Sequence, residues 1–107
     1  MKSKDKVALQ YSFEEVFKTC LMSINRLNKW KIVTSDYFCG VIHAKVGLNW
    51  ESFGERIEIK LTEEGETITI VEIESRSALP TLFDNGRNKA NINEIIKSIK
   101  KNLYFYD

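Results

Sequence analysis

The stretch from Tyr11 to Leu27, YSFEEVFKTCLMSINRL, carries the clearest helix signal in the chain. Ser12 and Glu15 have the spacing of a capping box, in which the serine hydroxyl accepts from the Glu15 amide and the glutamate carboxylate reaches back to the Ser12 amide. Behind this cap, apolar residues recur at helical spacing and form one stripe: Phe13, Val16, Phe17, Cys20, Leu21, Ile24 and Leu27. We therefore predict a helix over residues 13–28 that buries one face.

A second stripe near the C-terminus predicts another amphipathic helix. Asp84 or Asn85 can cap it, and Lys97, Lys100 and Lys101 in its last turns suit the negative end of a helix. Its apolar residues again recur at helical spacing: Ile92, Ile95, Ile96, Ile99 and Leu103. Two such stripes need an apolar surface to cover, so we expect both helices on the same face of one sheet.

Between the two helices, and before the first, β-prone segments alternate apolar and polar residues. The expected strands cover residues 7–11, 30–34, 38–46, 55–61 and 67–77. Short connections between the last four favour an antiparallel meander. The alternation changes phase near Ile70, which either a β-bulge or a sheet that is partly apolar on both faces would produce. The predicted fold class is α+β, in the order β-α-β-β-β-β-α, with a five-stranded antiparallel sheet whose second face is open.

Length and composition limit both the architecture and the function. The chain has 107 residues, 43% of them hydrophobic, which fits a single domain over residues 1–107. Sixteen basic and fifteen acidic residues give a net charge of +1, without the strong positive charge typical of a dedicated nucleic-acid-binding protein. The sequence has neither a membrane-spanning apolar run nor a signal-peptide core, and two cysteines are too few for a disulfide framework. We therefore expect a cytoplasmic protein.

The order of the predicted elements resembles the fold shared by the repeat unit of the TATA-box-binding protein and, in longer form, by the Bet v 1-like, START-related ligand-binding domains. A local pattern comprises Ser75-Arg-Ser77, Leu79-Pro80-Thr81, Phe83-Asp84-Asn85-Gly86-Arg87-Asn88 and Asn91-Ile92. This pattern is similar to one found in short bacterial proteins of unknown function, in which a serine-rich strand end leads through a proline into a helix. The resemblance implies architecture and suggests function only by analogy.

The chemistry-bearing residues do not form a recognisable catalytic pattern. The single histidine, His43, lies mid-strand, and one histidine makes a triad or an ordinary zinc site difficult to assemble. Cys39 has no helix start or cationic cluster nearby in sequence that would lower its pKa. The glycines have neither the dinucleotide-binding nor the P-loop spacing. We therefore predict a non-enzymatic protein without catalytic residues, metal or cofactor.

Two parts of the predicted fold could bind a ligand or partner. The segment between Gly47 and Gly54 contains two aromatic residues and could meet the 78–86 segment at one end of the sheet, although these aromatics could equally pack onto the rim of the core. The candidate ligand-binding residues at this loop end are Trp50, Phe53, Arg56, Arg76, Leu82, Phe83 and Arg87. The second part is the open sheet face, with Val33, Val41 and His43.

The predicted function is therefore binding of a small apolar ligand or a protein partner, through the loop end or the open sheet face. A homodimer that buries Val33 and Val41 between two chains is an alternative. A nucleic-acid-binding module is a weaker one, because basic and acidic residues mix on the open face and the mixture repels phosphate. These residues are Lys31, Lys45, Arg56 and Lys60 with Glu58, Glu72 and Glu74.

Overall fold

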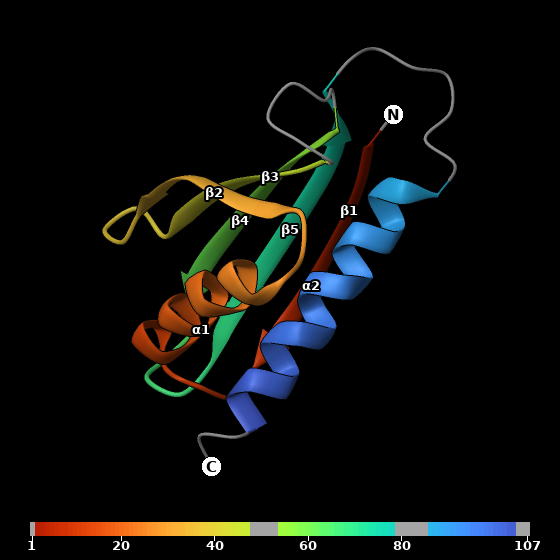
Figure 1. The fold of residues 1–107 in the computed structure, drawn as a ribbon. Coiled ribbons are helices and arrows are strands. Elements are labelled where there is room, and N and C mark those ends of the chain that lie inside the picture. Colours follow the sequence, from red (N-terminus) through yellow and green to blue (C-terminus); the bar gives the residue numbers. More distant parts are fainter. Residues whose placement is uncertain (1, 48–53, 79–85, 105–107) are drawn as a thin grey trace.

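The computed structural model describes residues 2–47, 54–78 and 86–104. The elements are β1 (Lys2–Leu9), α1 (Phe13–Arg26), β2 (Trp30–Asp36), β3 (Val41–Val46), β4 (Glu55–Glu63), β5 (Thr69–Ser77) and α2 (Arg87–Tyr104). All neighbouring strands are antiparallel, in the spatial order β1-β5-β4-β3-β2. Both helices lie on one side of the sheet (Figure 1), so the predicted α+β class, element order and one-sided helix packing are confirmed.

Helix α1 begins at the predicted cap. The Ser12 hydroxyl oxygen accepts from the Glu15 amide over 3.2 Å. The Glu15 carboxylate accepts from the Ser12 hydroxyl over 3.0 Å, where the capping-box prediction used the Ser12 amide as donor. The helix ends at Arg26, slightly before the predicted end, because Leu27 turns to an extended conformation while its amide bonds to the carbonyls of Ser23 and Ile24.

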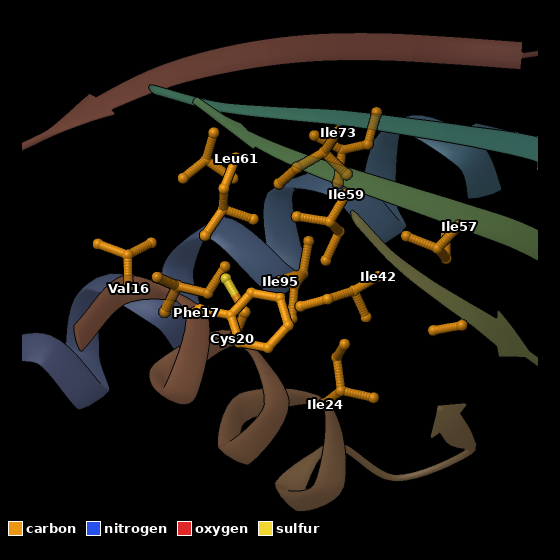
Figure 2. Packing of buried hydrophobic residues seen from close by; sticks show 14 of the residues in the cluster. Val16, Phe17, Cys20, Ile24, Ile42, Ile57, Ile59, Leu61, Ile73 and Ile95 are labelled. Atoms are coloured by element: carbon orange, nitrogen blue, oxygen red, sulfur yellow. The ribbon is translucent and has the colours of Figure 1, made fainter. Parts of the chain in front are cut away.

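One apolar core fills the space between the helices and the sheet. Cys20 and Ile24 of α1 face Ile42 and Ile59 of the sheet, with Ile95 of α2 beside them (Figure 2). All five of these side chains are fully buried. Burying an aliphatic side chain of this size contributes roughly 1.5–3 kcal/mol, so this cluster supplies the main attachment of both helices to the sheet.

The phase change near Ile70 does not come from a bulge. Strand β5 keeps a continuous register with β1 and β4, and Val71 and Ile73 point into the core while Ile70 is half-buried on the other face. The irregularity lies instead in β2, where the register with β3 shifts between Ile32 and Thr34. The outer face is therefore partly apolar at Ile70, the second of the two explanations offered by the sequence.

Several strand boundaries differ from the predictions. β1 begins at Lys2 rather than near residue 7, because eight residue pairs with β5 outweigh the weak β propensity of its charged first half. β3 begins at Val41, since residues 37–40 form a turn in which Gly40 has φ +68°. The predicted α2 caps, Asp84 and Asn85, lie outside the described residues. Neither α1 nor α2 is long and apolar enough to cross a membrane.

Candidate ligand-binding site

A cluster of polar side chains lies on the helix-covered face, at one end of the sheet. Glu55 is the first residue of β4, Ser75 and Ser77 lie at the end of β5, and Asn88 and Asn91 belong to the first turns of α2. Glu55 pairs with Ser77 across the β4–β5 ladder. These positions continue the inward-facing rows of the apolar core, so the core becomes polar at this end. We call these five residues the polar cluster.

Side-chain hydrogen bonds connect the cluster between strand and helix. The Ser75 hydroxyl donates to Asn88 Oδ1 over 2.8 Å, and Asn88 Nδ2 donates to Ser77 Oγ over 3.3 Å. Asn91 Nδ2 donates to Glu55 Oε1 over 2.9 Å and lies 3.4 Å from Ser75 Oγ. Ser75 and Asn88 are completely buried. Such a network stabilises a fold only when its members are satisfied, and in the described residues no buried side-chain nitrogen or oxygen lacks a partner.

The Glu55 carboxylate gives the polar cluster its charge. Its side chain is only 6% exposed, and its second oxygen, Oε2, lies 3.7 Å from Nε of Arg87. That distance permits an ion pair but exceeds a hydrogen bond. No other described residue donates a hydrogen bond to Oε2. An acceptor of this kind can take a hydrogen bond from an amine, hydroxyl or amide of a bound molecule.

The predicted loop-end residues do not all gather at this site. Arg87 reaches the polar cluster through Glu55. Arg56 and Arg76 are paired opposite each other on β4 and β5, but their side chains lie on the other face of the sheet. The apolar members of the prediction lie outside the described residues: Trp50, Phe53, Leu82 and Phe83. Of the seven predicted residues, the described structure therefore places Arg87 at the polar cluster.

Sequence reasoning did not select the buried polar residues themselves. Their positions did carry a signal, because Asn88 and Asn91 precede Ile95 by seven and four residues and so share its helix face. Likewise, Glu55 alternates in phase with Ile57 and Ile59. Polar residues at inward-facing positions of otherwise apolar stripes were the available clue.

The open face carries a second hydrogen-bonded arrangement, around His43. Its Nδ1 lies 3.2 Å from the Thr34 hydroxyl and its Nε2 lies 3.0 Å from a Glu58 oxygen. The carboxylate orients the ring as it would for a general base, but the histidine side chain is 47% exposed on the outer face. One concavity is lined by residues that include Tyr37 and Leu61, another by residues that include Ser3 and Ile92, and His43 belongs to neither. The arrangement therefore lies on the exposed sheet surface and not in either concavity.

The other predicted open-face residues are exposed among charged neighbours. Val33 lies at the irregular point of β2 and is 48% exposed. Val41 is half-buried between Asp36 of β2 and Lys60 of β4 in the same cross-strand row. No group of three or more His, Cys, Asp or Glu side chains suited to a metal ion occurs within residues 2–47, 54–78 and 86–104.

The comparisons with known proteins concern the fold. No protein-family model matches the chain, and no curated protein matches it in sequence. An uncharacterized protein from Bacillus thuringiensis matches over 100% of both chains, with 11% identity and a TM-score of 0.64. BexL, a di-domain ARO/CYC protein of the BE-7585A biosynthetic pathway, matches with 9% identity and a TM-score of 0.66. The chain has a Bet v 1-like fold.

This result confirms the resemblance to the Bet v 1-like domains that the order of elements implied. The match to BexL covers 97% of this chain and 46% of BexL, so the chain spans about half the length of that protein. Norcoclaurine synthase from Thalictrum flavum, solved in complex with dopamine and hydroxybenzaldehyde, is also similar: 8% identity, a TM-score of 0.55, and 94% and 87% coverage of the two chains. Identities this low show a shared fold and no shared activity.

Proposed function

We propose that this protein binds a small ligand with an apolar, preferably aromatic, body and at least one hydrogen-bond donor. The ligand would lie at the loop end of the sheet with its donor directed at Glu55. The observation that carries the proposal is the Glu55 carboxylate, which is buried beside the apolar core and has one oxygen without a donor among the described residues. A ligand hydroxyl or amine would supply that donor.

The energetics favour a polar anchor of this type. A hydrogen bond to a charged group contributes about 1.5–3 kcal/mol. Because the Glu55 carboxylate is largely shielded from water, the low local dielectric would strengthen this hydrogen bond further. The apolar body would contact the loop residues predicted from the sequence: Trp50, Phe53, Leu82 and Phe83. The phenolic and amine groups of the ligands bound by norcoclaurine synthase, a protein of the same fold, support this ligand class.

The proposal is limited to binding. Ser75 has a hydroxyl in the polar cluster, but its partners are the amides of Asn88 and Asn91, neither of which can remove a proton. A serine nucleophile requires a general base within hydrogen-bond reach. We therefore infer a non-enzymatic role, in which the cluster orients the ligand.

A homodimer through the open face is less well supported. The centre of a dimer interface is depleted in charged residues. Val41, which would be central, instead shares its cross-strand row with Lys6, Glu72, Lys60 and Asp36. Burying that row between two chains would require desolvating four charged groups.

The test is a nitrogen-15 NMR titration with dopamine and 4-hydroxybenzaldehyde as probes. We expect concentration-dependent shifts of the Glu55 and Asn91 amides, and at least tenfold weaker binding to Glu55→Gln. Glu58→Gln is the matched control, because it removes the same charge from the opposite face of the same strand. Absence of shifts at millimolar probe, or equal weakening by both variants, would overturn the proposal.

A further inference from the structure

The strand register aligns basic residues in one row across the outer face. Each strand contributes one residue, and each residue is the direct cross-strand partner of the next: Lys2, Arg76, Arg56, Lys45 and Lys31. We call these five residues the basic row. Neighbouring strands lie about 4.8 Å apart, so the row extends over roughly 19 Å. The alternation of charge along each strand conceals this alignment in the sequence.

Few ion pairs neutralise the positive charges of the basic row within the described structure. Arg76 pairs with Glu74 over 2.5 Å, and this contact holds the pKa of the Glu74 carboxyl below its ordinary value. Lys31, Lys45 and Arg56 form no ion pair with any described residue, and neither does Lys2. Like charges directly opposite each other on neighbouring strands destabilise a sheet. A bound anion would therefore reduce the repulsion between the positive charges of the basic row.

The rest of the outer face limits the shape of that anion. The adjacent row contains Glu74 and Glu58, and the next contains Glu72 and Asp36. An anionic membrane or a nucleic-acid duplex would cover these rows as well as the basic row, and the carboxylates would repel it. A single narrow chain that crosses the strands along the basic row contacts the cations and avoids most of the carboxylates.

The composition of the face separates a peptide from a single-stranded nucleic acid. Proteins that bind single strands combine a positive surface with aromatic side chains on which bases stack. The outward-facing residues of the five described strands include no Phe, Tyr or Trp. An extended acidic peptide needs no stacking partner, and its same-side carboxylates recur about every 6.8 Å, so three or four of them match the row.

We infer that the basic row binds an extended, acidic segment of a partner protein, laid across the strands. The contacts would be ion pairs and charge-assisted hydrogen bonds from the two arginines and three lysines, which favour carboxylates. Because exposed ion pairs are screened by salt, the affinity would fall steeply with ionic strength. This surface lies on the opposite face from the polar cluster, so the inference does not depend on the proposed function.

The experiment uses a fluorescent deca-glutamate peptide and the full chain at low salt, read by anisotropy. We expect binding, and a loss of at least tenfold in affinity for the double variant Lys45→Gln/Arg56→Gln. The matched control, Lys6→Gln/Lys60→Gln, removes two positive charges from the same face but outside the basic row. Its affinity should change less than threefold. Circular dichroism and urea denaturation establish that both variants are folded.

Three results would overturn the inference. The first is no binding of deca-glutamate to the unaltered chain at low salt. The second is an equal loss in the two double variants, which would indicate net charge rather than the basic row. The third is tighter binding of an oligothymidine of equal charge, or of phosphatidylserine vesicles, than of the peptide, which would assign the surface to nucleic acid or to membrane. None of these results bears on ligand binding at Glu55.

Discussion

The side chain of Asn91 donates a hydrogen bond of 2.9 Å to the Glu55 carboxylate and so ties α2 to the first residue of β4. A second buried asparagine, Asn102, makes a comparable link further along α2, where it donates to the Ser23 hydroxyl of α1 over 2.8 Å. The two links differ in the charge of the acceptor and in their distance from the loop end. Removing each asparagine therefore compares two losses of stability: one in which a neutral hydroxyl loses its amide donor, and one in which a buried carboxylate does.

We predict that Asn91→Ala destabilises the protein by about 2–3 kcal/mol, because it leaves the buried Glu55 carboxylate without its amide donor. Asn102→Ala should cost about 1–2 kcal/mol. It leaves the neutral Ser23 hydroxyl without its donor, and the Arg26 guanidinium, which donates to Asn102 Oδ1 over 3.0 Å, is exposed and can be solvated by water instead. Urea denaturation of both variants measures the two free energies of unfolding. An equal or larger loss for Asn102→Ala would contradict the importance assigned to the Glu55 charge.

Replacing a central member of the basic row should stabilise the fold. We expect Lys45→Thr and Arg56→Thr each to raise the free energy of unfolding by about 0.2–1 kcal/mol, because each removes two like-charge pairs between neighbouring strands. Lys60→Thr is the control, as it introduces the same β-prone residue but removes the ion pair with Glu58. Urea denaturation should show the gain at low salt and its reduction in 1 M salt. A gain that is equal at both salt concentrations would have another cause.

The turn before β3 depends on glycine at position 40. Gly40 has φ +68°, and a Cβ atom there would lie 2.6 Å from the Leu61 carbonyl oxygen. Gly65 also has a positive φ, of +93°, but has open space around it. We predict that Gly65→Ala lowers the free energy of unfolding by about 1 kcal/mol, from backbone strain alone. Gly40→Ala should lower the free energy of unfolding by about 3 kcal/mol, because the backbone strain and the clash with the Leu61 carbonyl oxygen combine. Similar melting temperatures for the two variants would contradict this.

The two cysteines should react at very different rates. Burial raises the pKa of the Cys20 thiol to about 12, whereas Cys39 is exposed and its pKa is raised by the neighbouring Asp36 carboxylate. Because the thiolate is the reactive form, a raised pKa lowers the reactive fraction at pH 8. We expect Ellman's reagent to modify one thiol in the folded protein and two in urea.

The effect of Asp36 on Cys39 has a direct test. Asp36→Asn keeps an oxygen that can accept from the Cys39 amide, as Asp36 does over 3.0 Å, but removes the negative charge. The pKa of Cys39 should therefore fall and its reaction at pH 8 should accelerate. Ser35→Ala, at the neighbouring exposed position, is the control and should leave the rate unchanged. A slower reaction of Asp36→Asn would show that the carboxylate does not suppress the thiolate.

The two helices, the alternating strands and the covering of one sheet face could all be predicted from the sequence. These features depend on local periodicity: a capping box at Ser12 and apolar stripes every three or four residues are read within a short segment. The extent of β1 was not available in this way, because its charged first half forms a strand only through its pairing with β5. The hydrogen bond between His43 and Glu58 could not be predicted either, because Glu58 becomes a neighbour of His43 only across the β3–β4 ladder.

Both candidate surfaces depend on contacts between segments that are far apart in the sequence. The polar cluster exists because Glu55, Ser75 and Asn91 meet where two strands end and a helix begins, and their burial depends on that meeting. The sequence analysis treated the open face as a mixture of charges, whereas strand register separates a basic row from the acidic rows beside it. Periodicity states which face a residue occupies, but a shift of the register would change every cross-strand neighbour. The positions of the charges on that face therefore depend on how the strands pair.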